Sequence, residues 1–195
     1  ETVGVLLDDD ANRIIIERES PTMVSDAYLR EKSGQTRKLT NNKDYSPEIT
    51  NAPRKLIEVT RADGYKFWVR VTLPPNMQPG VKPPGMFWFY PREFDTQDAY
   101  DRTNRASNKN LFPNVAVRDM EILTKLGYTV VEPDAPITGA TGRMNDNYVN
   151  DLRNNLSATI DELDRLGYAD RARLGVGGHS YGGFSTVNAM VNTPF

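Results

Sequence analysis

Residues 178–183, which read Gly-His-Ser-Tyr-Gly-Gly, are the stretch of this sequence best suited to covalent chemistry. They fit the pattern Gly-x-Ser-x-Gly, in which a sharp turn between a strand and a helix presents a serine hydroxyl. Gly178 and Gly182 flank Ser180 two positions away on either side, where larger side chains would crowd so tight a turn. The pattern predicts that Ser180 is a nucleophile with a strained backbone.

The residues around the motif have the local pattern that such a turn requires. Residues 173–177 are predicted to form a short buried strand, and residues 184–191 can continue as a helix. The alternative interpretation is a glycine-rich turn in which Ser180 only caps the helix. The order of strand, serine turn and helix favours the catalytic interpretation.

The composition limits the chemistry that can accompany this serine. The sequence has no cysteine, which excludes disulfides, thiolate catalysis and cysteine-bound metals, and we predict no cofactor and no metal. The formal net charge is −2, and no apolar run approaches the length of a membrane span. We therefore expect neither nucleic acid nor a membrane as a partner.

The single histidine of the sequence, His179, lies directly beside Ser180. A catalytic triad needs a base that approaches the serine hydroxyl from another loop, so His179 is badly placed for that role. In α/β-hydrolases the acid and the histidine follow the serine, but residues 181–195 contain no Asp, Glu or His. We therefore expect the chain to be a fragment that carries a nucleophile without its acid and base.

Two domains are predicted. Residues 1–50 contain four short strands joined by tight turns, a pattern typical of about one blade of a β-propeller. Residues 41–53 are polar and contain proline, which indicates a linker. Residues 51–195 are predicted to be the N-terminal part of a catalytic domain, truncated after the serine turn. It opens with an Asp-Gly hairpin between strands at 55–60 and 65–73.

Strands and helices alternate along the rest of the chain. We predict strands at 86–90, 129–131 and 173–177 and an irregular segment at 92–113. A helix at 114–126 is predicted to have its apolar residues on one side, namely Ala116, Met120, Leu123 and Leu126. A second helix at 147–166 is predicted to have an apolar stripe that forms core, with Val149, Leu152, Leu156, Ile160, Leu163 and Leu166. This order predicts a parallel sheet with right-handed crossovers, with Ser180 at the carboxyl end of a strand, where such sheets bind ligands. The expected fold class is α/β, an incomplete α/β-hydrolase domain preceded by β-propeller blade strands.

Several motifs in this layout resemble one family. The turn at 178–184 is similar to the Gly-x-Ser-Tyr-Gly-Gly pattern of the prolyl oligopeptidase family of serine peptidases, and residues 61–64 and 73–75 resemble the entry to its catalytic domain. Residues 87–94 and 136–139 look most like the glutamyl endopeptidase branch, known from plastids and bacteria. For a bacterial protein this resemblance favours a periplasmic or secreted location.

The resemblance implies hydrolysis of peptide substrates through an acyl-enzyme on Ser180, and in that branch cleavage after glutamate or other acidic residues. The backbone N–H of Tyr181 is then one oxyanion donor, because that donor follows the nucleophile. The hydroxyl of Tyr90 is the candidate for a second donor. The sequence at 90–93 is Tyr-Pro-Arg-Glu, where many members of the family carry a His-Gly-Gly-Pro-like turn.

Two other functions stay open at this stage. One is an esterase or other acyl hydrolase, since fold does not decide substrate, although the blade-like strands argue against it. The other is a non-catalytic interaction protein, against which the intact Ser180 argues. We expect the 195-residue chain alone to be inactive. We also expect it to associate or aggregate unless the missing C-terminal segment of the same protein covers the unfilled sheet edge.

Overall fold

The computed structural model describes residues 1–105, 110–113, 115 and 120–195. The chain divides into two compact units, one of residues 1–50 with 108–116 and the other of residues 51–107 with 117–195. No helix in the described part of the chain is both long and apolar enough to span a bilayer.

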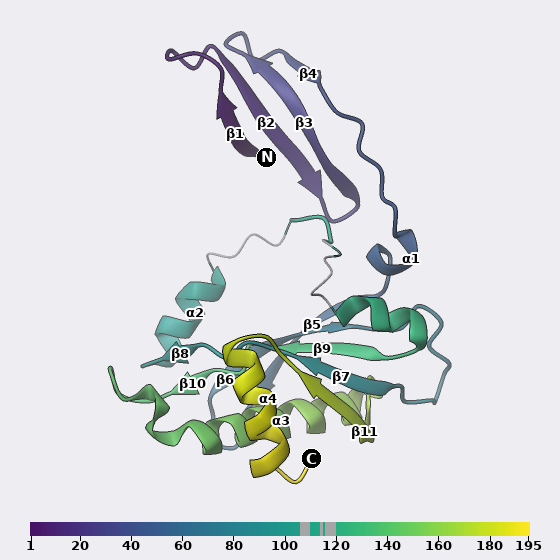
Figure 1. Ribbon diagram of the computed structural model, residues 1–195, viewed down its shortest axis with the longest axis vertical. Coiled ribbons are helices and arrows are strands. Elements are labelled where there is room, and N and C mark those ends of the chain that lie inside the picture. The colour runs from purple at the N-terminus through teal and green to yellow at the C-terminus, as the bar shows by residue number, and fades with distance from the viewer. Residues whose placement is uncertain (106–109, 114, 116–119) are drawn as a thin grey trace. The chain divides into compact units, whose positions relative to one another are not determined.

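The first unit is a four-stranded antiparallel sheet in which the strands lie in chain order (Figure 1). Strand β2 alternates in burial, with Ile14 and Ile16 inside, as expected of a strand with one covered face. The predicted linker contains a single helical turn, α1 (Pro47–Thr50). All four predicted strands are confirmed, as β1 (Thr2–Leu6), β2 (Arg13–Ser20), β3 (Met23–Glu31) and β4 (Thr36–Lys38). Their assignment to one propeller blade stays a prediction.

The second unit is built on a five-stranded mixed sheet in the order β11-β7-β9-β6-β5. The strands β11, β7 and β9 pair in parallel, and the predicted hairpin joins the same sheet antiparallel to β9. Gly64 turns this hairpin with a φ of 90°, which glycine adopts freely. The strands are β5 (Arg54–Thr60), β6 (Lys66–Thr72), β7 (Pro84–Trp88), β9 (Thr129–Pro133) and β11 (Asp170–Gly177).

Strand β11, which leads into the serine turn, is an edge strand within the described residues, where it pairs with β7 on one side. The prediction of a short buried strand at 173–177 is therefore wrong in two respects. The strand begins three residues earlier, at Asp170, and its side chains are half-buried or exposed. An edge strand has one neighbouring strand to cover it, whereas a buried strand needs two.

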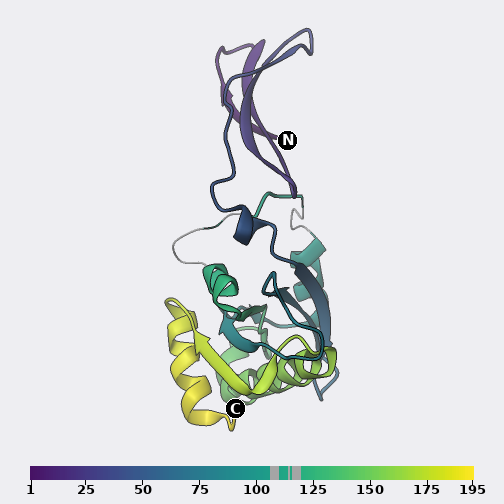
Figure 2. The same ribbon diagram turned by 90° about the vertical axis from the view of Figure 1, so that its right-hand side faces the viewer.

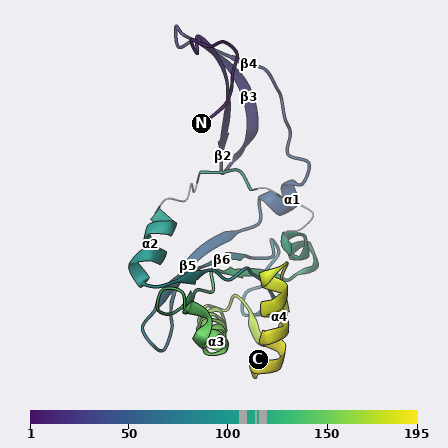
Figure 3. The ribbon, with the colours of Figure 1, turned by 60° about the vertical axis from the view of Figure 1, so that its left-hand side comes forward.

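Two long helices, α3 (Tyr148–Leu166) and α4 (Tyr181–Asn192), lie on the same face of this sheet (Figure 3). Helix α3 confirms the helix predicted at 147–166, and Gly167 ends it in the left-handed conformation with a φ of 73°. The predicted apolar stripe of α3 forms core, with buried side chains at Leu152, Leu156, Ile160 and Leu163.

The prediction of an irregular segment at 92–113 is wrong. The segment contains a two-residue strand, β8 (Glu93–Phe94), paired with β10 (Ile137–Thr138), and a helix, α2 (Gln97–Arg105). The hydroxyl of Thr96 accepts a hydrogen bond from the N–H of Ala99 at 3.1 Å and so caps α2. Helix α2 is mostly polar, so it has too few apolar residues to show the spacing by which a helix is recognised in a sequence.

The helix predicted at 114–126 can be compared with the structure only in part, because residues 114 and 116–119 lie outside the described residues. Its remainder, η1 (Met120–Leu126), is a 3-10 helix rather than an α-helix. A 3-10 helix has three residues per turn, so the residues that face inward differ from those expected of an α-helix. Thr124 is buried, whereas Leu126 is 72% exposed, which contradicts its predicted packing. A second 3-10 helix, η2 (Met144–Asn147), precedes α3.

A buried ion pair ties the hairpin to α3. The guanidinium of Arg61 donates to the carboxylate of Asp151 at 2.6 Å, and each of these side chains is 1% exposed. Asp151 also accepts hydrogen bonds from the N–H and the hydroxyl of Thr138, at 2.7 and 3.1 Å. Because three segments meet at one carboxylate, this pair holds the hairpin, β10 and α3 in register with one another.

We predict that Asp151→Ala lowers the free energy of unfolding by about 3–5 kcal/mol, because it leaves the charge of Arg61 buried without this partner. On the same helix, Asp161 is the matched control, since its carboxylate is 59% exposed. Asp161→Ala should cost less than about 1 kcal/mol. Urea unfolding monitored by the fluorescence of Trp68 and Trp88, the two tryptophans of the chain, would measure both changes. Equal losses would contradict the role of the pair.

Candidate active site

Ser180 lies at the turn where the chain leaves β11 and reverses into α4 (Figure 2). Its backbone has a φ of 55° and a ψ of −119°, a region that residues with a side chain rarely occupy. Such a conformation costs on the order of 1–3 kcal/mol. The turn is closed by a hydrogen bond from the N–H of Gly182 to the carbonyl of His179 at 2.8 Å. The backbone strain predicted at this serine is therefore observed.

The two glycines of the motif allow backbones to touch. A Cβ on Gly178 would overlap the backbone of Gly182, and a Cβ on Gly182 would overlap the carbonyl oxygen of Phe89. At Gly183, in contrast, a Cβ would lie 3.5 Å from the nearest atom, which is an ordinary contact. Gly178 is thus required by the tightness of the turn itself, and Gly182 by the close approach of the turn to the residues after β7. Gly183 is not required in this way.

The side chain of Ser180 is exposed and does not cap α4. This contradicts the alternative interpretation of Ser180 as a simple helix cap. Its hydroxyl makes no hydrogen bond to any other described residue. The neighbouring His179 is also exposed. A base positioned to take the serine proton is therefore absent from the part of the chain that the structure describes.

The two predicted oxyanion donors lie next to each other. Tyr181 is the first residue of α4, and N–H groups of a first helical turn have no partner inside the helix and lie at its positive end. Tyr90 follows β7 and is 55% exposed. The rings of Tyr90 and Tyr181 pack edge to face, with centroids 5.8 Å apart. The structure thus brings the two residues that were predicted to supply oxyanion donors to the serine turn.

A layer of hydrogen bonds behind the turn holds Tyr181 in place. The buried hydroxyl of Tyr148 donates to Ser185 at 2.6 Å, and the hydroxyl of Ser185 donates to the Tyr181 carbonyl at 2.6 Å. The Tyr181 hydroxyl donates to the side-chain oxygen of Asn145 at 2.9 Å. Burial raises the pKa of both tyrosines, so that both stay protonated as donors near neutral pH.

Sequence reasoning missed this supporting layer. Tyr148 lies four residues before Leu152 and extends the predicted stripe of α3 by one turn, so helical spacing could have indicated it. Asn145 lies in η2, at the end of a proline- and glycine-rich stretch with no periodic signal. It contacts Tyr181 although the two residues are 36 positions apart in the sequence.

A hollow beside the serine turn contains two arginines, and we refer to it as the arginine hollow. Tyr90 and His179 connect it to the turn. Two arginines and two acids contribute charge to its walls. Its full lining is Arg70, Trp88, Phe89, Tyr90, Arg92, Glu132, Pro133, Asp134 and His179. The hollow therefore combines aromatic surface with ionic groups, which suits part of a peptide substrate.

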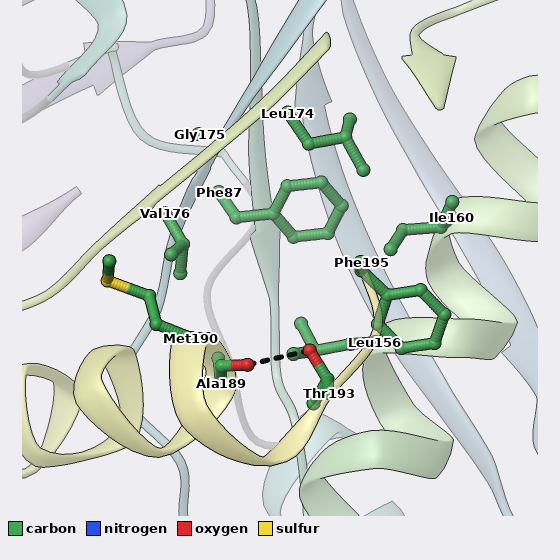
Figure 4. Close-up of a pocket in the computed structure, with 10 residues that line it drawn as sticks. All are labelled: Phe87, Leu156, Ile160, Leu174, Gly175, Val176, Ala189, Met190, Thr193 and Phe195. Carbon is green, nitrogen blue, oxygen red and sulfur yellow. Dashed lines mark hydrogen bonds between the residues drawn. The ribbon is translucent and has the colours of Figure 1, made fainter. Parts of the chain in front are cut away.

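A second hollow, between β7, β11, α3 and α4, has a different character (Figure 4). Side chains such as Phe87, Val176 and Phe195 line it, and no titratable group contributes to its walls. Thr193 is its one hydroxyl-bearing residue, and that hydroxyl donates to the Ala189 carbonyl at 2.6 Å. This apolar hollow offers no acid, base or nucleophile and is not a candidate for catalysis. Among the described residues, no group of three or more His, Cys, Asp or Glu side chains could hold a metal ion.

The chain resembles known proteins in sequence. Residues 113–195 match the family model described as the prolyl oligopeptidase family. The whole chain is 28% identical to a probable chloroplastic glutamyl endopeptidase of Arabidopsis thaliana, over 21% of that protein. It is 29% identical to the protein of the same description from Oryza sativa subsp. japonica, over 22% of that protein. The chain thus spans about a fifth of the length of the curated relatives it matches.

Solved structures show the same fold. Dipeptidyl peptidase 4 of Porphyromonas gingivalis superposes with a TM-score of 0.64 at 18% identity, covering 96% of this chain and 26% of that one. The acylaminoacyl peptidase of Pyrococcus horikoshii gives a TM-score of 0.57 at 20% identity, covering 91% of this chain and 27% of that one.

The class of protein follows from these matches: the chain has the α/β-hydrolase fold preceded by propeller-type strands, as predicted. Within that class, residues 113–195 resemble the prolyl oligopeptidase family. The predicted resemblance to this family and to its glutamyl endopeptidase branch is confirmed.

We predict that Gly182→Ala lowers the free energy of unfolding of the second unit by about 1–3 kcal/mol, because the added methyl group overlaps the Phe89 carbonyl. Gly183→Ala is the matched control one position along α4. Because it has room for a methyl group, it should be neutral or stabilise the helix by up to about 1 kcal/mol. Urea unfolding of both variants is the measurement. A neutral Gly182→Ala would show that the close approach is not required.

Proposed function

We propose that the protein containing this chain is a serine peptidase that acts through an acyl-enzyme on Ser180. The observation that best supports this proposal is the exposed Ser180 hydroxyl on a strained turn, with Tyr181 and Tyr90 beside it. The serine oxygen forms a bond to the peptide carbonyl carbon, and the carbon–nitrogen bond then breaks as the leaving amine takes up a proton. Water releases the acyl group in the second half of the reaction.

We further propose that the negative oxygen formed during attack is bound by the N–H of Tyr181 and the hydroxyl of Tyr90. Both groups come from fixed positions, one from the first turn of α4 and the other from the residues that touch Gly182. Donors that are held in place before the reaction need no reorganisation when charge develops. The base and its acid are proposed to lie outside residues 1–195, since no described residue bonds to the serine hydroxyl.

The proposed substrates are peptides, with cleavage after glutamate or other acidic residues. The preference for glutamate is supported by the description of the two plant relatives as glutamyl endopeptidases. In the same proposal, residues 1–50 are about one blade of a propeller and residues 51–195 are part of the catalytic domain. The division of the chain near residue 50 supports this arrangement. An esterase is less well supported, because both solved relatives described above are named as peptidases.

We predict that a fluorophosphonate probe labels the full-length protein on Ser180, because the probe reacts with serines that have an activating base. Ser180→Ala should abolish labelling and peptide hydrolysis. Ser157→Ala, on α3, should leave both intact. The isolated 195-residue chain should be neither labelled nor active, since none of its described residues places a base at the serine. Mass spectrometry of the labelled peptide identifies the site, and labelling that persists in Ser180→Ala would overturn the assignment.

We predict that Tyr90→Phe in the full-length protein lowers kcat by about 10²–10³-fold, the usual cost of one lost oxyanion donor. KM should change little, because the hydroxyl binds charge that exists only in the transition state. Tyr128→Phe is the control, at a tyrosine that follows η1 and is 37% exposed. Steady-state kinetics on one peptide substrate would compare them. An unchanged kcat in Tyr90→Phe would reject the role.

A further inference from the structure

We infer that Arg92 is a specificity residue that binds a carboxylate side chain of the peptide beside the scissile bond. This inference rests on the proposed peptidase function and adds to it the side chain that recognises the substrate. Arg92 lies two residues after Tyr90 and lines the arginine hollow together with Tyr90 and His179. A carboxylate bound there would lie next to the serine turn.

The first observation is that Arg92 has no counter-charge. Its side chain is exposed, and no carboxylate among the described residues lies within ion-pair distance of its guanidinium. The other arginine of the same hollow, Arg70, lies 3.4 Å from the carboxylate of Asp134 and 3.9 Å from that of Glu132. Of the two arginines in the hollow, only Arg92 therefore lacks an acid partner among the described residues.

The acids of the hollow are already occupied, so they do not compete for Arg92. Asp134 is buried and accepts a hydrogen bond from the hydroxyl of Tyr100 at 2.8 Å, in addition to its pairing with Arg70. Glu132 is within reach of Arg70 from the neighbouring strand position. What the hollow presents to a ligand is thus aromatic surface and one unpaired guanidinium.

The second observation is that Arg92 is held in place before any ligand arrives. The preceding Pro91 is buried, and the carbonyl of Arg92 accepts a hydrogen bond from the N–H of Ile137 at 2.9 Å. The guanidinium lies 5.9 Å from the centre of the Phe94 ring, a cation–π contact. An arginine with a fixed backbone and a stacked head group loses less freedom on binding than a freely moving one.

The chemistry of this arrangement selects a carboxylate. A guanidinium can donate two parallel hydrogen bonds to the two oxygens of a carboxylate, which an amide or an apolar side chain cannot accept in the same way. The charge then discriminates glutamate from glutamine, which have nearly the same shape. The substrates of the experiment distinguish recognition of the residue before the scissile bond from recognition of the residue after it.

The experiment measures kcat/KM of the full-length protein on four peptides that share one sequence and a C-terminal amide. They carry glutamate or glutamine at the position before the scissile bond, or at the position after it. We expect a preference for glutamate at one of the two positions. Arg92→Gln should reduce that glutamate-to-glutamine ratio by about 10- to 100-fold, the range expected for one lost charge-assisted hydrogen bond. Arg92→Lys, which keeps the charge but not the paired geometry, should reduce it less.

Arg37→Gln is the matched control, because Arg37 is also an exposed arginine without an ion partner among the described residues, but it lies in the first unit. It should leave the ratio unchanged. A ratio that Arg92→Gln does not alter, in a protein that still hydrolyses the peptides, overturns the role of Arg92 and leaves the peptidase function standing. If none of the peptides is hydrolysed in a Ser180-dependent way, the proposed function fails and the role of Arg92 fails with it.

Discussion

The carbonyl oxygen of Phe89 occupies the space that a side chain on Gly182 would need, and much of the proposed active site depends on this contact. It brings the residues after β7 against the first turn of α4, so that Tyr90 and Tyr181 face each other across it. Gly178 allows the same closeness within the turn itself. Because main chains touch here, the backbone positions of Ser180, Tyr181 and Tyr90 do not depend on flexible side chains.

The sheet positions the two segments that make this contact. Strands β7 and β11 run in parallel, and their register pairs Trp88 with Gly177, so both strands end at the same edge. Strand β9 runs in the same direction beside β7 and ends nearby, which delivers Asp134 to the wall of the arginine hollow. Ligand sites at the carboxyl ends of parallel strands arise in this way, because residues that are far apart in sequence share one edge.

Charge is used in two ways in the same unit. The Arg61 guanidinium is buried, and Asp151 and Asp63 satisfy it, so it holds segments together and is closed to a ligand. The Arg92 guanidinium is exposed, is stacked on Phe94 and has no acid beside it within the described residues. The residue type is the same, and only the surrounding acids differ. A buried charge destabilises the fold unless it is paired, whereas an exposed charge can remain unpaired until a substrate binds.

The sequence by itself determined the features that depend on neighbours along the chain. The serine turn with its two glycines, the Asp-Gly hairpin and the apolar stripe of α3 ending at Gly167 all follow from spacings of a few residues. Local turn chemistry and periodicity are sufficient for such features, and they indicate Ser180. Tyr181 and Tyr90 are candidates only through the resemblance of the sequence to a known family.

The tertiary structure decided what depends on distant partners. It made β11 an edge strand, turned η1 into a 3-10 helix that exposes Leu126, and brought Asn145 to Tyr181. It also paired Arg70 and left Arg92 without an acid. Nothing in the local pattern distinguishes those two arginines. The packing of the whole unit determines which strands become neighbours and which charges meet. Each of these contacts joins segments that are far apart in the sequence, and no local pattern indicates that they pair.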